Sequence, residues 1–181
     1  MEELLYSPSD IAKIIRKRDM GARAGQEFVS AVWEVEKDFI PSVYRRNQRK
    51  FILDVMDKLN FLENTDTYQR EIPSVNRDLS DLGSKTVITE DKYFMELDTF
   101  FKELRLRIVV LDKQDFVRMK LRTMLREHGY KRRSPQLIRH LHKCLYFYHL
   151  ETYIRGEVEC DIEEISLDDM ITFRVAGCAG K

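Results

Sequence analysis

The stretch SPQLIRHLHKCLYFYHLETYIR, residues 134–155, decides how the C-terminal half of the chain is interpreted. Ser134 is a good N-cap residue and Pro135 suits the first helical position. The residues of one apolar stripe recur at helical spacing: Leu137, Leu141, Cys144, Leu145 and Tyr148. The pattern predicts a long helix from Ser134 to Arg155 that ends before Gly156.

Upstream of this stretch the sequence predicts two more helices. One covers residues 91–107, with Phe94, Leu97, Phe101 and Leu104 on one side, and the other runs from Gln114 to His128 and ends at Gly129. The run from Leu106 to Leu111 is rich in β-branched residues, so it fits either a buried strand or a continuation of the helix.

Downstream of Gly156 the pattern changes to alternation. Val158, Cys160 and Ile162 alternate with acidic residues, and a turn at residues 166–169 precedes the β-branched and aromatic run Met170–Val175. We therefore predict a β-hairpin. Helix, basic turn, helix and hairpin is the order of elements in a winged helix-turn-helix.

The N-terminal part, residues 1–62, predicts three amphipathic helices joined by short turns, which would form a small bundle. Ser7 and Pro8 begin the first helix, Pro41 stops the second, and the third covers residues 42–62. Residues 63–90 are polar, and we expect a linker or excursion there, with a short strand at Val87-Ile88 as one alternative; we expect residues 176–181 to form a flexible tail.

The fold class expected from these patterns is mainly α. It consists of an N-terminal helical bundle and, over residues 91–175, a basic helical module that ends in a β-hairpin and is winged-helix-like.

Composition limits the function classes. The 31 basic and 31 acidic residues give a formal net charge of zero, so the whole chain has no general attraction to nucleic acid or membrane. No stretch has the length and apolarity of a signal sequence or a membrane span. Three unpaired cysteines suit a reducing compartment. We expect an intracellular protein, cytoplasmic or nuclear, with no membrane partner and no cofactor.

Charge is segregated along the chain. Residues 102–155 hold 14 basic and five acidic residues, whereas residues 156–181 hold two basic and seven acidic ones. In the predicted helix, Arg118, Arg122 and Arg126 form one ridge. The face expected to bind nucleic acid or an acidic partner comprises Arg118, Arg122, Arg126, Lys131, Arg132, Arg133, Arg139 and Lys143. The alternative is ordinary solvated surface.

Aromatic residues cluster near the end of the predicted long helix. Tyr146, Phe147 and Tyr153 would form an exposed patch for a protein partner or for self-association, unless the helix is buried on several sides.

Two metal hypotheses receive little support from the sequence. His140 and Cys144 are one helical turn apart, but no second pair stands at zinc-finger spacing, so we expect a core cysteine and no metal. Glu90, Asp91 and Lys92, with Asp78 and Asp81 upstream, resemble a nuclease arrangement, but acids also suit the first turn of a helix. Sequence motifs for catalysis or for phosphate binding are absent.

These observations favour a non-enzymatic protein–protein interaction or assembly subunit with segregated charge blocks. The alternative is a nucleic-acid-binding protein that uses a basic helical face.

Overall fold

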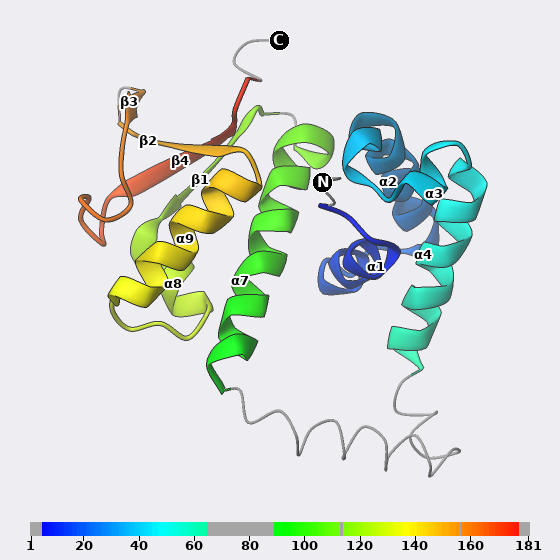
Figure 1. Ribbon diagram of the computed structural model, residues 1–181, viewed down its shortest axis with the longest axis horizontal. Helices are drawn as coiled ribbons and strands as arrows, with labels where there is room; N and C mark the ends of the chain where they lie inside the picture. The colour runs from blue at the N-terminus through cyan, green and yellow to red at the C-terminus, as the bar shows by residue number, and fades with distance from the viewer. Residues whose placement is uncertain (1–4, 65–88, 113, 156, 178–181) are drawn as a thin grey trace. The chain divides into compact units, whose positions relative to one another are not determined.

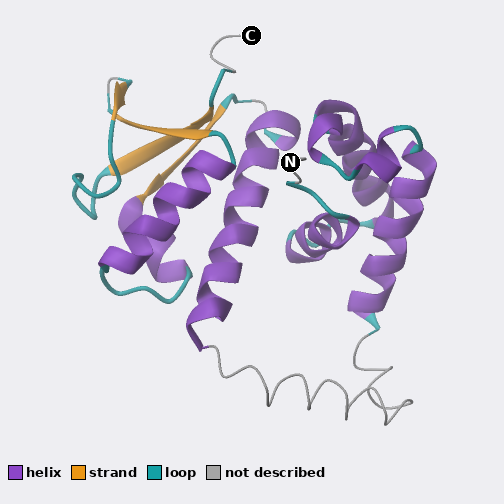
Figure 2. Cartoon of the chain, in the orientation of Figure 1, coloured by secondary structure: helices purple, strands orange, loops and turns teal. Residues whose placement is uncertain are grey.

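The computed structural model describes residues 5–64, 89–112, 114–155 and 157–177. The described parts are mainly helical, with one small antiparallel sheet near the C-terminus (Figure 2). Contacts divide the chain into two units, Met1–Glu90 and Asp91–Lys181, and each is described by itself.

The N-terminal unit consists of helices. They are α1 (Pro8–Lys17), α2 (Ala22–Val35), the 3-10 turn η1 (Lys37–Phe39), α3 (Ser42–Arg45) and α4 (Gln48–Glu63). The predicted start of α1 is confirmed, because the Ser7 hydroxyl accepts a hydrogen bond from the Asp10 N–H and the Asp10 carboxylate accepts one from the Ser7 N–H. The single helix predicted over residues 42–62 is wrong. The Asn47 side chain caps α4 at the Lys50 N–H and separates it from α3.

The core of this unit is aliphatic and aromatic. Ile11, Ile14 and Ile15 of α1 are buried, as are Phe28 and Val32 of α2 and Phe51 and Val55 of α4. α1 packs most closely against α4. Trp33 Nε1 donates a hydrogen bond to the Tyr44 carbonyl at 2.9 Å, which joins α2 to α3. This helical packing agrees with the amphipathic patterns of the sequence.

The described residues of the C-terminal unit include three α-helices and one π-helical turn. They are α7 (Thr89–Leu106), the π-helical turn η2 (Arg107–Leu111), α8 (Leu121–Glu127) and α9 (Pro135–Phe147). The run 106–111 is therefore helical, which resolves the ambiguity of its sequence. It ends where the Asp112 N–H donates to the Arg107 carbonyl.

Four strands form one antiparallel sheet in the order β1-β4-β2-β3 (Figure 1). The strands are β1 (Phe116–Lys120), β2 (Leu150–Ile154), β3 (Val158–Glu159) and β4 (Met170–Val175). Central β4 places Phe173 opposite both Val117 and Thr152. All three are buried, and Phe101 of α7 packs edge-on against Phe173 with ring centroids 6.3 Å apart. The helices therefore cover one face of the sheet.

The predicted pairing of the last two strands is wrong. β3 pairs with β2, while β4 pairs with β1 and β2, so no hairpin joins β3 to β4. Residues 160–169 run between them as a loop in which Ile162 and Ile165 are buried.

Two helix predictions extended too far. Residues 116–120 are a strand, because Val117 and Met119 lie opposite Phe173 and Ile171 of β4. The helix predicted to reach Arg155 ends at Phe147, since His149 has a positive φ of 52° and Leu150 and Thr152 then alternate into the core as β2.

Several predictions fall outside the described residues. The strand at Val87-Ile88, the acids Asp78 and Asp81, and the end of the tail from Cys178 onward are among them. The Glu90-Asp91-Lys92 segment lies within α7, although its side chains are not described. None of the described helices has the length and apolarity needed to cross a membrane.

Candidate nucleic-acid interface

Helix α8 is attached to the rest of the C-terminal unit at both of its ends. The N–H groups of Leu121 and Arg122 donate to the carbonyls of Asp169 and Leu167, which ties the start of α8 to the loop before β4. At its other end buried His128 is the C-cap of α8, with Nδ1 2.7 Å from the Met124 carbonyl. The His128 ring also packs against Phe100 of α7, with ring centroids 4.9 Å apart, so both ends of α8 contact other parts of the C-terminal unit.

The turn between the two helices uses residues that suit its backbone. Gly129 has a φ of 81°, a left-handed conformation that glycine adopts without strain. The Ser134 hydroxyl then accepts a hydrogen bond from the Leu137 N–H, and Pro135 occupies the first turn of α9, as predicted.

One side of α9 is buried and the other is polar and exposed. Leu137, Leu141 and Cys144 face the core. The α9 ridge consists of exposed residues at helical spacing: Gln136, Arg139, Lys143 and Tyr146. Arg126, Lys131 and Arg132, in α8 and the turn before α9, are also exposed. The predicted basic face is therefore present in part.

Three of the eight basic residues predicted for this face have other roles. Arg118 lies on the outer side of the sheet, where its Nε donates to Thr172 Oγ1 at 3.0 Å and its guanidinium lies over the Phe116 ring. Arg122 pairs with Asp168, and Arg133 donates to three carbonyls of the loop before β4. The ridge predicted for Arg118, Arg122 and Arg126 is wrong, since Arg118 belongs to a strand.

The acidic segment, residues 157–169, lies beside α9. It carries seven carboxylates: Glu157, Glu159, Asp161, Glu163, Glu164, Asp168 and Asp169. His142 Nε2 is 2.9 Å from Asp161 Oδ1, which joins this segment to α9. The Glu163 N–H and then His142 hold the pKa of Asp161 below its ordinary value.

The predicted aromatic patch divides into two places. Tyr146 is 87% exposed and neighbouring Phe147 is 42% exposed, at the end of α9. Tyr153 is on the outer side of the sheet instead, where its hydroxyl donates to Glu151 at 2.8 Å. That hydrogen bond raises the pKa of Tyr153. Only Tyr146 and Phe147 therefore form a shared apolar surface.

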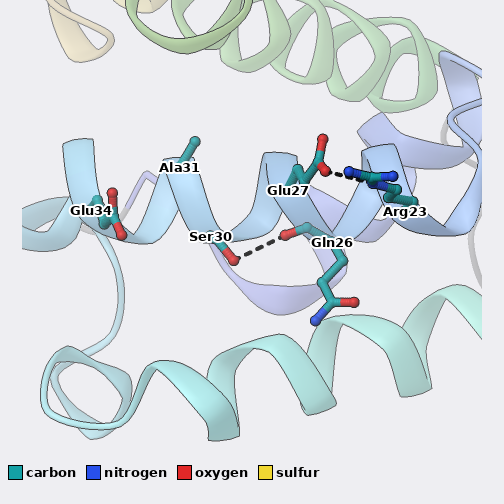
Figure 3. Close-up of a pocket in the computed structure, with 6 residues that line it drawn as sticks. All are labelled: Arg23, Gln26, Glu27, Ser30, Ala31 and Glu34. Carbon is teal, nitrogen blue, oxygen red and sulfur yellow. Dashed lines mark hydrogen bonds and ion pairs between the residues drawn. The ribbon is translucent and has the colours of Figure 1, made fainter.

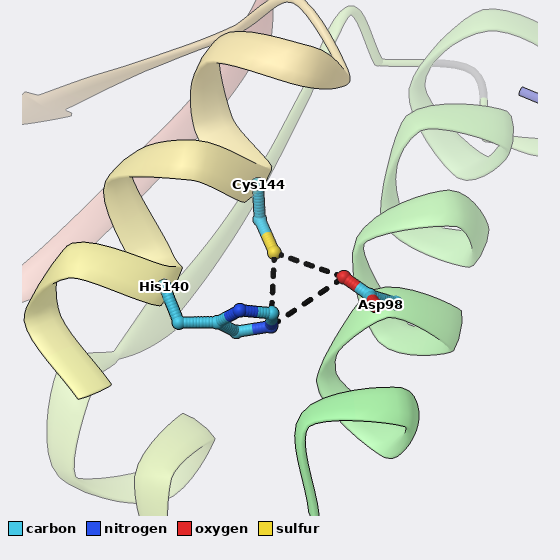
Figure 4. Close-up of side chains that lie close together, drawn as sticks. All are labelled: Asp98, His140 and Cys144. Atoms are coloured by element: carbon cyan, nitrogen blue, oxygen red, sulfur yellow. Dashed lines mark hydrogen bonds and ion pairs between the residues drawn. The ribbon is translucent and has the colours of Figure 1, made fainter. Parts of the chain in front are cut away.

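Asp98 of α7 joins His140 and Cys144 of α9 in a cluster that the sequence pattern did not indicate (Figure 4). The Cys144 thiol donates to Asp98 Oδ1 at 3.2 Å, and His140 Nε2 lies 3.4 Å from that oxygen and 3.5 Å from the sulfur. Burial and then the Asp98 carboxylate hold the pKa of the Cys144 thiol well above its ordinary value. Asp98 is 42 residues from His140, too far for a spacing motif to connect them.

Two hollows on the N-terminal unit do not bring reactive groups together. A shallow hollow of about 430 Å³ follows α2 and is lined by residues of that helix alone, where Arg23 pairs with Glu27 and Ser30 donates to the Gln26 carbonyl (Figure 3). A second hollow, of about 400 Å³, includes Tyr44 and Asp54. The Tyr44 hydroxyl donates a hydrogen bond to the Asp54 carboxylate, so these two groups satisfy each other.

No protein family, curated protein or solved structure matches the chain.

Proposed function

We propose that residues 91–177 form a winged helix-turn-helix module that binds double-stranded nucleic acid through α9, in a role without catalysis. The element order supports this proposal, because α7, β1, α8, α9, β2, the acidic segment and β4 follow one another as helix, strand, two helices, strand, wing and strand. In a helix-turn-helix the second helix of the pair enters the major groove. Here that helix is α9.

The observation that carries the proposal is the α9 ridge. Glutamine pairs with adenine and arginine or lysine with guanine at base edges, and Gln136, Arg139 and Lys143 are exposed along one line of the helix. Gln136 and Arg139 lie in the N-terminal half of α9, the part of a recognition helix that contacts base edges.

The turn before α9 supplies charge for the phosphates. α8 ends at Glu127 and α9 begins at Pro135, so the connection is longer than the three or four residues of a compact helix-turn-helix. The longer connection places exposed Lys131 and Arg132 immediately before the helix. Cations there would neutralise phosphates next to the groove.

The acidic segment limits the size of this interface. Its carboxylates would repel phosphate, so contacts are expected from α8, the turn and α9 only. Five exposed cations are available: Arg126, Lys131, Arg132, Arg139 and Lys143. Since each neutralised phosphate contributes about −0.9 to the salt slope, we expect a slope no steeper than about −4.5.

The test compares two variants that lose the same charge. Fluorescence anisotropy with a mixed-sequence duplex, over a series of salt concentrations, should give salt-dependent binding to the wild-type chain. Arg139→Gln should weaken that binding, because it removes a cation and a base-edge donor from the α9 ridge. Arg118→Gln, on the outer side of the sheet, is the matched control and should bind as the wild type does.

Two results would contradict the proposal. One is an absence of duplex binding at low salt. The other is an equal effect of Arg139→Gln and Arg118→Gln, which would mean that any cation on the surface suffices.

Exposed Tyr146 and Phe147 favour a second candidate, self-association of the chain. Segregated charge supports it, because the basic α9 side of one copy would complement the acidic segment of another. Light scattering should then show a dimer that a Tyr146→Ser/Phe147→Ser variant loses. A wild-type chain that is monomeric at both low and high salt would exclude this candidate.

A further inference from the structure

We propose that Asp98, His140 and Cys144 form a binding site for a zinc-class divalent ion between α7 and α9. This inference is independent of the proposed nucleic-acid binding. Its ligand atoms would be a carboxylate oxygen, Nε2 of the imidazole and the cysteine sulfur, all of which zinc accepts.

The distances between the three ligand atoms suit a tetrahedral ion. Bonds of about 2.0–2.1 Å to nitrogen and oxygen and about 2.3 Å to sulfur require separations of about 3.3 Å for N–O and about 3.6 Å for the pairs with sulfur. The observed separations are 3.4 Å for N–O, 3.5 Å for N–S and 3.2 Å for O–S. Small side-chain movements are enough to complete the geometry.

Two helices, α7 and α9, hold the three ligands on opposite sides of the site. His140 and Cys144 are four residues apart, so they project from the same side of α9, and Asp98 faces them from α7 (Figure 4). Leu97 and Phe101 of α7 and Leu141 of α9 are fully buried close to these ligands in the chain, which anchors both backbones. A bound ion would cross-link the two helices.

The cluster is accessible to an ion. It borders a hollow of about 390 Å³, also lined by Lys143 and Phe147. The Asp98 and His140 side chains are 43% and 20% exposed, whereas Cys144 is buried. With three protein ligands, the fourth position would be open towards this hollow and hold water or another small ligand.

The ligand set selects among ions. One sulfur and one imidazole nitrogen favour zinc and similar first-row ions, while magnesium and calcium prefer oxygen ligands. The same three side chains also form hydrogen bonds without an ion, with the thiol as donor to Asp98. The experiment must therefore distinguish an ion site from a hydrogen-bonded cluster.

Cobalt(II) is the probe, because its absorption spectrum reports tetrahedral geometry and sulfur ligation. The 181-residue chain with Cys160→Ser and Cys178→Ser retains Cys144 as its single cysteine. Titration under reducing, anaerobic conditions should give visible d–d bands and a thiolate-to-cobalt charge-transfer band. Zinc should displace the cobalt and remove both signals.

Variants test each ligand. Cys144→Ser in the otherwise wild-type chain should lose the charge-transfer band. Asp98→Asn and His140→Gln should weaken cobalt binding more than about tenfold, since even partners outside the ligand shell are worth 10- to 100-fold. His142→Gln, also on α9, is the matched control and should bind as the parent does. Circular dichroism verifies the fold of each variant.

Three results would overturn the proposal. They are the absence of a charge-transfer band in the single-cysteine chain, its persistence in Cys144→Ser, and equal weakening by His140→Gln and His142→Gln. If Cys144→Ser does not fold, the Asp98→Asn variant decides, because the half-exposed Asp98 side chain can be replaced with little effect on packing.

Discussion

Arg122 and Asp168 form a double hydrogen-bonded ion pair, with Nε–Oδ1 and Nη2–Oδ2 distances of 2.8 Å each. The pair connects the first turn of α8 to the loop before β4, where the backbone N–H of Arg122 also donates to Leu167. Paired hydrogen bonds of this kind fix orientation as well as distance. They define how the acidic segment meets α8.

This pair should be measurable by titration of Asp168. Hydrogen bonds from Arg122 hold the pKa of that carboxyl below its ordinary value. Because the pKa is depressed in the folded state, the pair stabilises the fold fully above the ordinary carboxylate pKa of about 3.9 and loses its effect as pH falls through the lower folded value. NMR of the carboxyl carbon should show that Arg122→Gln raises the pKa of Asp168 towards 3.9. An unchanged pKa would mean that the pair does not persist in solution.

Arg133 should contribute to stability through the backbone that it binds. Its Nη1 lies 2.8, 2.9 and 2.7 Å from the carbonyls of Ile162, Glu163 and Ile165. Arg133→Ala leaves these acceptors without that donor, and we expect a loss of about 1–3 kcal/mol in the free energy of unfolding. Urea denaturation measures the loss.

The adjacent Arg132 offers the matched control. It is exposed, so Arg132→Ala should change the free energy of unfolding by less than about 0.5 kcal/mol. Faster amide hydrogen exchange at residues 162–165 in Arg133→Ala alone would confirm the local cause. Equal destabilisation by both variants would refute it.

Tyr44 should titrate late among the tyrosines. Its hydroxyl donates to Asp54 at 2.7 Å, and this hydrogen bond, with burial as a second cause, raises the pKa of Tyr44 to about 12. A raised folded pKa means that the contribution is fully present below about pH 10 and is lost as pH rises through about 12. Absorbance titration should show a late tyrosinate step that Tyr44→Phe removes.

The same substitution should cost stability at neutral pH. We expect Tyr44→Phe to lower the free energy of unfolding by about 0.5–1.5 kcal/mol, the usual net value of one hydrogen bond. Tyr146→Phe removes a hydroxyl from a side chain that is 87% exposed and should have almost no effect. A late titration step that survives Tyr44→Phe would assign it to another tyrosine.

Zinc should stabilise the chain if the Asp98 cluster binds it. An ion at 100 times its Kd adds about 2.7 kcal/mol, which for a chain of this size corresponds to a rise in Tm of roughly 5–10 °C. Differential scanning calorimetry should detect this rise in the wild type and not in Asp98→Asn. A similar rise in both proteins would indicate zinc binding elsewhere.

The sequence predicted helices well where one periodic pattern dominated. Ser7 and Ser134 marked helix starts that the structure confirms, because a side-chain cap is a local interaction. Residues 116–120 were wrongly predicted as helix because Phe116 and Val117 also fit one helical side with Leu121, Met124 and Leu125. The pairing of Phe116 and Val117 with Arg174 and Phe173, more than 50 residues away, makes this segment a strand.

The candidate sites differ in how far the sequence could define them. The α9 ridge follows from one helix, so its exposed residues could be predicted. The sequence could not show that Arg122 and Arg133 bind the loop before β4, because that loop lies more than 25 residues further along the chain. Asp98 was missed for the same reason, because it reaches His140 and Cys144 only when α7 packs against α9.

The strand order β1-β4-β2-β3 leaves β1 and β3 at the two edges of the sheet. β1 carries Arg118 and Lys120, and β3 is two residues long, contains Glu159 and directly follows Glu157. Short or charged edges resist pairing with strands of other molecules. The basic residues of β1 and the acidic residues at β3 therefore also protect the sheet from adding strands of other molecules and growing into aggregates.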